Sequence, residues 1–225
     1  MKIAIIVAMR AELDMLLPLV EEMKETVING CRIYTGRMGA NEVAIMQTGI
    51  GKVNAAVGAL SLIDSFRPDL MVNTGIAGGT GNGADIFDVV IADEIGYHDV
   101  YCGPGNARGQ VQGLPEKFPC LGTALVDLSR AEALAPVRRG LIASGDLFVS
   151  TPEELQAVLA VQPSAVAVDM ESGAIAQVCF MKDVPFLAIR VVSDTPGVEN
   201  HHEQYGNFFT LAPQSTFSVV KALLS

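Results

Sequence analysis

Short apolar runs alternate with helical repeats along the whole chain, and this alternation restricts the possible folds more than any other feature. The runs at 3–8, 69–74, 165–168 and 186–192 are rich in apolar residues at successive positions, which predicts strands buried on both faces. Such strands belong to a parallel or mixed sheet that is covered by helices. We therefore expect an α/β fold in which residues 1–225 form a single domain, because no repeat, low-complexity tract or linker interrupts the pattern.

The remaining segments supply the other strands, the helices and one long loop. A hairpin is expected at 31–38 and 42–48, and further strands at 87–95 and 139–144. Residues 97–119 carry many Gly and Pro and little periodicity, which predicts a loop long enough to be functional. Helices are predicted at 11–24, 53–63, 121–135, 153–161, 171–181 and 205–224.

Composition excludes several classes of protein. The formal net charge of −10 disfavours nucleic acid as a partner, because an acidic chain repels phosphate backbones. Half of the residues are hydrophobic, which argues against disorder, yet no apolar stretch reaches the roughly 18 residues that span a membrane. The cysteines show neither a C-x-x-C pair nor a spacing typical of zinc sites. We expect a reduced, cytoplasmic, soluble protein with a small neutral or zwitterionic substrate and room for an apolar oligomer interface.

Polar side chains follow four of the predicted strands, at the carboxyl ends where the ligands of α/β sheets gather. Glu12 lies in the first helical turn after the first strand, and a glycine-rich turn is expected at 75–79. Asp169 and Glu171 stand where a strand meets a helix N-terminus, whose amides favour an ionised carboxylate. Asp194 follows the last strand. The sequence therefore predicts several acids at one edge of the sheet.

Each of these residues also has an ordinary structural explanation. The helix dipole alone favours Glu12, and capping alone explains Asp169 or Asp194. Arg190 lies inside an apolar strand, where a buried arginine needs a partner. Taken together, three acids at three strand ends with an arginine nearby are typical of acid–base chemistry on a polar small molecule.

Two further segments have both a functional and a structural interpretation. His201, His202 and Glu203 could suggest a metal site, but adjacent histidines point in different directions and no third ligand is evident. We therefore predict a solvated loop there and no metal ion. Phe148 follows another strand and is either part of the core or an aromatic ring on which a nucleobase stacks.

A set of short motifs follows the order of a known family over nearly the whole chain. The motifs are Ala8 and Met9 with Glu12, 48–52, 73–75 with 77–79, 144–146 with Phe148, Met170 with Glu171, and Ser193 with Asp194. With these motifs the sequence resembles the 5′-methylthioadenosine/S-adenosylhomocysteine nucleosidases, within the nucleoside phosphorylase superfamily. Each motif is short, and the set as a whole is specific.

The resemblance implies a three-layer α/β/α sandwich around a twisted mixed sheet, nucleoside phosphorylase-like and usually homodimeric. It implies hydrolysis of the N-glycosidic bond of 5′-methylthioadenosine and/or S-adenosylhomocysteine, which releases adenine in methionine salvage without a metal or organic cofactor. Asp194 would protonate adenine N7. Glu12 would activate the attacking water beside Arg190, and Glu171 would hold the ribose hydroxyls. The implied substrate-binding residues are Ala8, Ile50, Ile76, Phe148, Val149, Asp169, Met170, Ser193 and Tyr205.

The chain departs from this family in two places. Ile76 takes a position where the family often has a serine that can contact the water. The segment 105–109 lacks the aromatic residues that the family often brings to the partner subunit's pocket. The preferred 5′ substituent therefore stays open.

Three alternative functions stay open as well. A phosphorylase would use phosphate in place of water, but the strand at 70–73 contains no arginine, and Glu12 beside Arg10 would repel phosphate. A futalosine-type hydrolase shares the fold and the placement of the acids. A non-catalytic nucleoside-binding protein would bind the ligand without releasing adenine.

Overall fold

The first strand shows how alternating burial builds the layers of this molecule. In β1 (Lys2–Val7), the side chains of Ile3 and Ile5 pack in one hydrophobic cluster, and those of Ala4 and Ile6 pack in another. Successive side chains of a strand point to opposite faces, so both faces of β1 are buried. A strand of this kind requires helices on both sides of its sheet.

The computed structural model describes residues 1–28, 30–198, 201–211 and 214–225. The other strands are β2 (Glu21–Ile28), β3 (Cys31–Met38), β4 (Asn41–Gln47), β5 (Leu70–Gly79), β6 (Val89–Tyr97), β7 (Phe118–Pro119), β8 (Val137–Ser144), β9 (Ala165–Asp169) and β10 (Phe186–Asp194). The α-helices are α1 (Arg10–Leu16), α2 (Lys52–Phe66), α3 (Ser129–Glu132), α4 (Pro152–Val161), α5 (Ser172–Met181), α6 (His201–Leu211) and α7 (Gln214–Leu224). Two short 3-10 helices are η1 (Leu17–Leu19) and η2 (Leu121–Leu125). None of the described helices combines the length and the apolar composition that a membrane span requires.

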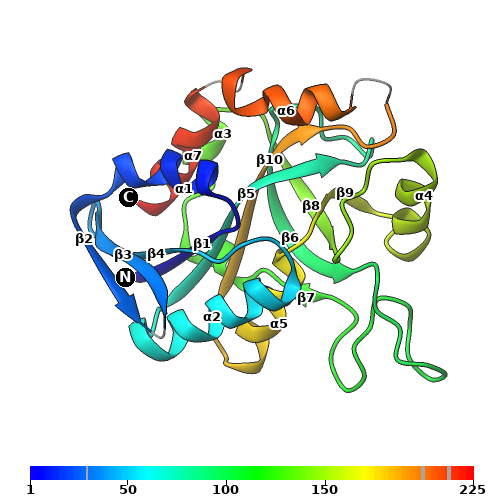
Figure 1. Cartoon of the computed structure of the whole chain (residues 1–225), viewed down its shortest axis with the longest axis horizontal. Helices are drawn as coiled ribbons and strands as arrows, with labels where there is room; N and C mark the ends of the chain where they lie inside the picture. The colour runs from blue at the N-terminus through cyan, green and yellow to red at the C-terminus, as the bar shows by residue number, and fades with distance from the viewer. Residues whose placement is uncertain (29, 199–200, 212–213) are drawn as a thin grey trace.

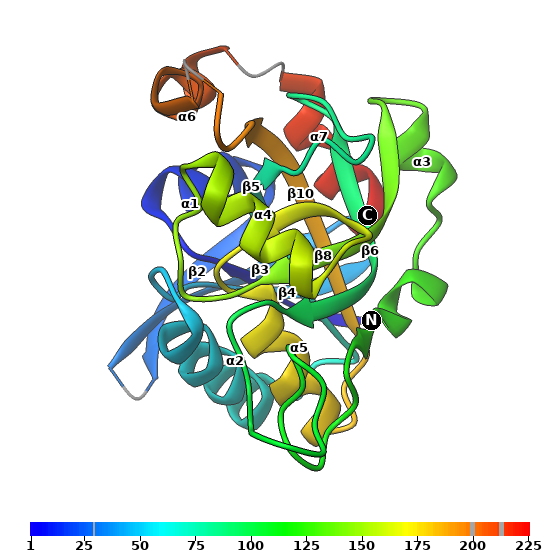
Figure 2. The same cartoon turned by 90° about the vertical axis from the view of Figure 1, so that its right-hand side faces the viewer.

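The strands form a mixed sheet in the order β10-β6-β8-β9-β5-β1-β4-β3-β2, and β7 pairs with β6. β1 lies parallel to β4 and β5, whereas β2, β3 and β4 pair in antiparallel fashion. β10 pairs with both β6 and β5, so part of the sheet closes into a ring (Figures 1 and 2). The expected mixed sheet is confirmed, and its closed ring is a feature that the sequence pattern did not predict.

Helices cover the sheet on both faces (Figure 1). α2 and α5 lie below it in that view, where Ala55 and Ile175 pack in the cluster that contains Ala4. α1, α3 and α7 lie on the opposite face, where Leu13 and Val219 pack in the cluster that contains Ile3. The three-layer α/β/α arrangement is therefore confirmed.

The helix expected at 11–24 is much shorter in the structure. α1 ends at Leu16, η1 follows with Pro18 in its first turn, and the residues from Glu21 onward form β2. Proline lacks the amide hydrogen that would continue the helix. β2 is an edge strand with mostly exposed side chains, so no buried apolar face marked it in the sequence.

Two other expected helices are divided in the structure. The segment 121–135 contains η2 and α3 as separate pieces. The single helix expected at 205–224 is wrong, because α6 already begins at His201 and α7 begins at Gln214. Their apolar side chains pack in different clusters, α6 near the ends of β5 and β10 and α7 against β1 and its neighbours. Positions 212–213 lie outside the described residues.

The glycine-rich segment 75–79 belongs to a strand rather than to a turn. β5 continues to Gly79 because its backbone pairs with β10 and, over its last residues, with β9. The strand expected at 69–74 was therefore correctly located but too short. The hairpin of β3 and β4 agrees with its prediction, and the segment 97–119 is a loop apart from its ends in β6 and β7.

Candidate active site

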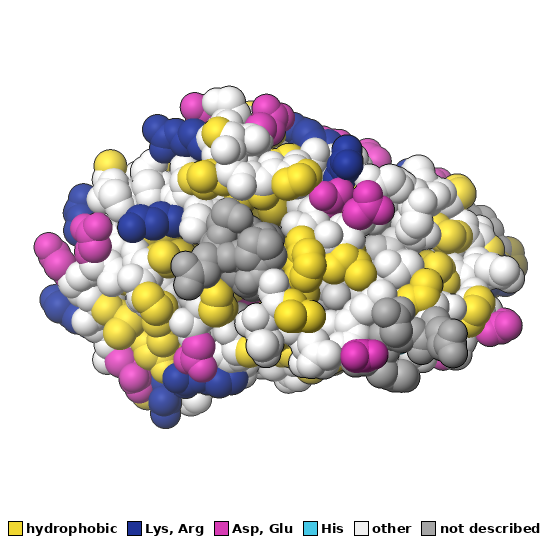
Figure 3. Space-filling model, turned by 90° about the horizontal axis from the view of Figure 1, so that it is seen from above, with side chains coloured by type: hydrophobic (Ala, Val, Ile, Leu, Met, Phe, Trp, Pro, Cys, Tyr) yellow, Lys and Arg dark blue, Asp and Glu magenta, His cyan; other side chains and the backbone are white. Residues whose placement is uncertain are grey.

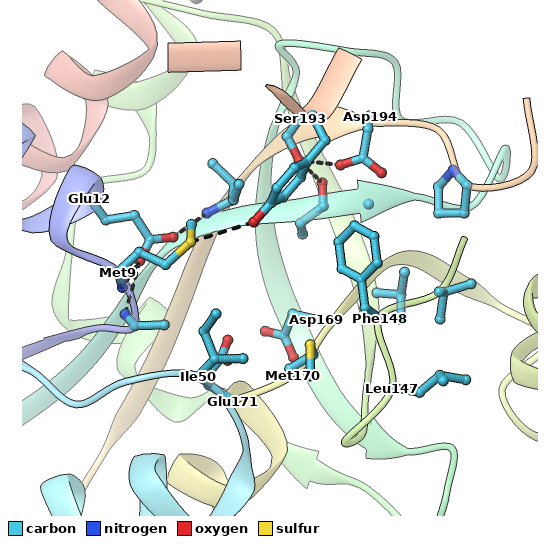
Figure 4. A pocket seen from close by; sticks show the side chains of 18 residues that line it. Met9, Glu12, Ile50, Leu147, Phe148, Asp169, Met170, Glu171, Ser193 and Asp194 are labelled. Atoms are coloured by element: carbon cyan, nitrogen blue, oxygen red, sulfur yellow. Dashed lines mark hydrogen bonds between the residues drawn. The ribbon is translucent and has the colours of Figure 1, made fainter. Parts of the chain in front are cut away.

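A cavity opens at the carboxyl ends of β1, β5, β9 and β10 (Figure 4). Its empty volume, including open solvent at the mouth, is about 590 Å³. Met9 and Glu12 lie at one end of the cavity in Figure 4, and Phe148 and Asp194 lie at the other. The chain thus brings strand ends that are far apart in sequence to one concave site.

Three backbone amides hold Glu12 at its end of the cavity. Its Oε2 accepts hydrogen bonds from the N–H groups of Ala8 and Met9, both at 2.9 Å, and its Oε1 accepts one from Ile76 at 3.0 Å. Burial raises the pKa of Glu12 above its ordinary value, and the charge of Arg190 and these hydrogen bonds oppose that rise. The ends of β1 and β5 therefore fix the orientation of this carboxyl group.

Gly75 in β5 lies between Glu12 and Arg190. Its φ is +152°, and a Cβ at this position would stand 2.3 Å from Glu12 Oε1 and 2.8 Å from Arg190 Nη1. A side chain here would push one of these groups out of place. The glycine is thus required by the close approach of two charged side chains, not by a turn.

Arg190 is completely buried in β10 and lies behind the residues that line the cavity. Its Nε and Nη2 donate to Asp169 Oδ2 at 2.8 and 2.6 Å, and its Nη2 also donates to Asn73 Oδ1. Among the described residues, no acceptor meets its Nη1. The partner that a buried arginine requires is therefore Asp169.

Asp169 and Glu171 flank the junction of β9 and α5. Asp169 Oδ1 accepts a hydrogen bond from Ser172 Oγ at 2.9 Å, so this residue serves the helix start as well as Arg190. Glu171 Oε1 accepts a hydrogen bond from the Gly51 N–H at 3.0 Å. Burial raises the pKa of Glu171 to about 7, with Arg190 opposing the rise and the negative charge of Asp169 adding to it.

Asp194 ends β10 at the opposite end of the cavity from Glu12. Its Oδ1 accepts a hydrogen bond from Ser193 Oγ, and its Oδ2 lies 2.7 Å from His201 Nε2. Ser193 Oγ also lies 3.3 Å from the Ala77 carbonyl oxygen. Both oxygens of this buried carboxyl group are therefore in polar contact.

The prediction of a solvated loop at 201–203 is wrong. These residues form the first turn of α6, and His201 is only 2% exposed because it packs against Asp194. The side chain of His202 lies outside the described part of the structure. Within that part, no group of three or more His, Cys, Asp or Glu side chains is arranged to hold a metal ion.

α6 also brings an aromatic side chain to the cavity. The Tyr205 hydroxyl donates to Met9 Sδ at 3.6 Å, and its ring centroid lies 5.2 Å from that of Phe148. Phe148 is 42% exposed, so part of its ring is open to a ligand or solvent. Figure 3 shows the molecule from above the view of Figure 1, with hydrophobic side chains exposed between charged ones.

Twelve of the thirteen residues predicted for the site line the cavity, and Arg190 is the exception. These twelve are Ala8, Glu12, Ile50, Ile76, Phe148, Val149, Asp169, Met170, Glu171, Ser193, Asp194 and Tyr205. Six further lining residues were not predicted, namely Met9, Ala77, Gly78, Leu147, Val168 and Pro196. Three of them, Met9, Ala77 and Gly78, belong to the family motifs of the sequence, and these motifs could have identified them.

The cavity is suited to proton transfer at two separate points of an uncharged ligand. Its described lining contains carboxyl groups at both ends and no Lys or Arg side chain. The exposed ring of Phe148 can stack on a planar group beside Asp194. Such a combination of apolar walls and a few converging polar groups is typical of a small-molecule site.

Comparison with known proteins identifies relatives over the full length of the chain. The family model described as the phosphorylase superfamily matches residues 2–225. The 5′-methylthioadenosine/S-adenosylhomocysteine nucleosidases of Geobacillus thermodenitrificans (strain NG80-2) and Geobacillus kaustophilus (strain HTA426) are 40% and 41% identical to it. Each alignment covers 100% of this chain and 97% of the relative.

Solved structures with the same fold support this relationship. The nucleosidase from S. pneumoniae with the transition-state inhibitor MT-ImmA has a TM-score of 0.91 at 34% identity, covering 100% of this chain and 98% of that one. The nucleosidase from Colwellia psychrerythraea 34H in complex with adenine has a TM-score of 0.89 at 33% identity, covering 100% and 94%. The nucleoside phosphorylase-like fold is thereby confirmed. The chain belongs to the phosphorylase superfamily and, within it, to the 5′-methylthioadenosine/S-adenosylhomocysteine nucleosidase family.

Proposed function

We propose that this chain hydrolyses the N-glycosidic bond of 5′-methylthioadenosine and/or S-adenosylhomocysteine, releasing adenine and the thioribose product. The observation that carries the proposal is the position of two buried carboxyl groups, Glu12 and Asp194, at opposite ends of one cavity. N-glycosidic cleavage needs a proton on the leaving base and a nucleophile at the sugar, so two separated carboxyl groups suit it. The names of the relatives, which contain both compounds, support the substrate class.

In this proposal, the adenine occupies the Asp194 end of the cavity. Phe148 offers a ring face for stacking, and the backbone of Val149 bonds the edge of the base. Asp194 gives a proton to N7, which allows the electron pair of the breaking C1′–N9 bond to move into the purine. Ser193 orients the carboxyl group through its hydrogen bond.

The ribose and the attacking water occupy the Glu12 end. Positive charge develops on the ribose in an oxocarbenium-like transition state, and the carboxylates of Glu12 and Glu171 stabilise that charge. Glu12 accepts a proton from the water as it attacks C1′, and Arg190 offsets the repulsion between the carboxylates. Glu171 and the Met170 backbone bind the ribose hydroxyls. The other proposed substrate contacts are Ala8, Ile50, Ile76, Asp169 and Tyr205.

The positions of the basic side chains support water, rather than phosphate, as the nucleophile. Arg10 forms an exposed ion pair with Asp14 at 2.8 Å, and Lys52 Nζ lies 2.7 Å from Asp99. The Nε and Nη2 groups of Arg190 already donate hydrogen bonds to Asp169. A phosphate dianion in the cavity would therefore face carboxylates without a cationic partner among the described lining residues.

We further propose that residues 1–225 form one nucleosidase domain that acts as a cytoplasmic homodimer in methionine salvage. The family match over residues 2–225 supports the single domain. The four cysteines are free thiols, which suits a reducing compartment. Exposed apolar side chains on α2 support the dimer.

The proposed reaction is tested by product analysis. The chain is incubated with 5′-methylthioadenosine or S-adenosylhomocysteine, with and without phosphate, and the products are separated and identified by mass. We expect adenine and the free thioribose at the same rate in both buffers. A phosphorylated sugar product would establish phosphorolysis, and tight binding without adenine release would establish a binding protein.

A further inference from the structure

His201 and Asp194 form a buried pair, and the reaction proposed above uses Asp194 but gives no role to His201. His201 is the first residue of α6 and Asp194 is the last residue of β10. The distance from His201 Nε2 to Asp194 Oδ2 is 2.7 Å, and the two side chains are 2% and 4% exposed. A contact of this length between two buried side chains is typical of a charge-assisted hydrogen bond.

The imidazole approaches Asp194 from the protein side of the carboxyl group. Asp194 lines the cavity, whereas His201 does not. The ring of Phe148 packs against the imidazole, with centroids 5.5 Å apart and planes inclined at 37°. Because a carboxylate oxygen can accept more than one hydrogen bond, His201 leaves the cavity side of Asp194 available to a nucleobase.

Ser193 allows the same carboxyl group to be either ionised or protonated. Its single O–H has two possible acceptors, Asp194 Oδ1 and the Ala77 carbonyl oxygen. When the hydroxyl donates to Ala77, its oxygen is free to accept a hydrogen bond from a protonated Oδ1. The surroundings of Asp194 therefore accommodate a proton that arrives and leaves.

Several titratable groups face the same cavity as the pair or lie on the helix that carries His201. Glu12 of α1 and Glu171 beside α5 face the same cavity, and Arg190 lies behind them. On α6 itself, Glu203 is exposed, and burial raises the pKa of Tyr205 so that its hydroxyl stays neutral. Two carboxyl groups therefore lie across the cavity from the histidine–aspartate pair.

We propose that His201 is a positioning residue that shares one proton with Asp194 and thereby keeps this carboxyl group supplied with the proton the reaction requires. The inference rests on the proposed function, in which Asp194 protonates adenine N7. In that step the O–H bond of protonated Asp194 breaks on its cavity side and an N7–H bond forms, while the C1′–N9 electron pair enters the base. The pair is left as a carboxylate and a neutral imidazole, and a proton from solvent restores it.

Three variants distinguish proton sharing from packing. His201→Gln keeps an N–H donor near the position of Nε2 but cannot exchange a proton, whereas His201→Ala removes the donor as well. Glu203→Gln changes an exposed side chain in the same helical turn and is the matched control. Adenine release is measured from about pH 5 to 9, a range that spans the titration of histidine.

We expect His201→Gln to lower kcat by up to about tenfold near pH 7, with KM within about threefold of the wild-type value. The basic limb of its kcat profile should move to lower pH by about one unit, because Asp194 must then hold the proton alone. Glu203→Gln should match the wild type. The proposal is overturned if His201→Gln keeps the wild-type pH profile. This holds even if His201→Ala loses activity, because that loss would then come from packing or the missing donor.

Nitrogen-15 NMR of the histidines tests the pair without relying on turnover. We expect the Nε2 resonance of His201 to move strongly in Asp194→Asn, while that of His98 stays in place. An unchanged His201 resonance would overturn the pairing even in an active enzyme. A wild-type chain that shows this response and releases no adenine would instead overturn the proposed function.

Discussion

Three buried carboxyl groups face one cavity, and the groups that touch each of them differ. Glu12 accepts three backbone N–H groups, Glu171 accepts one, and Asp194 meets a hydroxyl and an imidazole. Backbone donors favour the ionised form, whereas an imidazole beside a buried carboxyl group can share its proton. The proposed division into base and acid thus follows from the neighbours of each residue rather than from its type.

The raised pKa of Glu171 should make the stability of the folded protein depend on pH. Between its ordinary pKa of 4.5 and its raised pKa of about 7, the folded protein binds a proton there that the unfolded chain does not. The free energy of unfolding therefore falls as pH rises through this window, by at most about 3 kcal/mol. Glu171→Gln removes this titration, so the variant should gain stability relative to the wild type as the pH approaches 7.

Chemical denaturation at several pH values within this window measures the difference. The exposed Glu116→Gln variant is the control, and its stability should follow that of the wild type. A constant difference between Glu171→Gln and the wild type across the window would contradict the raised pKa.

At the residue scale, the acids could be predicted because each follows a strand with a clear apolar pattern. The need of Arg190 for a partner could also be inferred, although only the structure identifies Asp169. His201 could not be recognised, because its burial depends on how α6 docks against β10. The presence of Leu147 and Pro196 in the cavity lining likewise depends on how loops fold over the cavity.

At the level of single elements, we expect that adding one methyl group to β5 at Gly75 lowers both stability and activity. In Gly75→Ala, the new Cβ would collide with Glu12 Oε1 and Arg190 Nη1, and φ near +152° strains any residue but glycine. We expect a loss of stability of about 1–3 kcal/mol and a fall in kcat/KM of about 100-fold or more, as Glu12 is displaced. Thermal unfolding and steady-state kinetics measure the two effects.

Gly206→Ala in α6 is the matched control for this substitution. A Cβ at Gly206 would meet no heavy atom within 4 Å, so the variant should fold and turn over normally. If Gly75→Ala retained the kcat/KM of Gly206→Ala, the position of the Glu12 carboxylate would not matter for the reaction.

Elements buried on both faces were predictable, and elements defined by distant partners were not. β1 and β10 carry apolar residues at successive positions, a composition that identifies them without knowledge of their neighbours. β2 is stabilised by backbone pairing with β3 at the sheet edge. Backbone pairing does not require apolar side chains, so the sequence of β2 shows no clear strand pattern. The closed ring requires β10 to reach both β5 and β6, a long-range contact that local patterns do not encode.

At the scale of the whole molecule, α2 carries apolar side chains on two faces. Its inner face packs in the core through Ala55 and Leu62. On its outer face, Val53, Val57 and Leu60 are 74%, 55% and 40% exposed and recur at helical spacing. An exposed apolar stripe of this kind is typical of an interface, so we predict that it contributes to the proposed homodimer.

Replacing Val53 and Val57 together by Asp should convert the dimer into a monomer at micromolar concentration, because two buried charges would lack partners. Light scattering after size-exclusion chromatography gives the mass. Leu134→Asp, an exposed apolar residue beyond α3 on the opposite helical layer, should leave the dimer intact. A monomeric wild type would contradict the dimer, and an unaffected double variant would exclude this stripe.

We infer that the fold brings Asp194 to one end of the cavity as the acid that activates the leaving adenine. The most direct test compares kcat/KM of the wild type and Asp194→Asn on two substrates. One is 5′-methylthioadenosine, and the other is the matching 5-methylthioriboside of 4-nitrophenol, whose leaving group needs no proton. We predict a loss of about 10²- to 10⁴-fold for the first and less than about tenfold for the second. Equal losses on both substrates, or no loss on 5′-methylthioadenosine, would show that Asp194 is not the acid that protonates the leaving adenine.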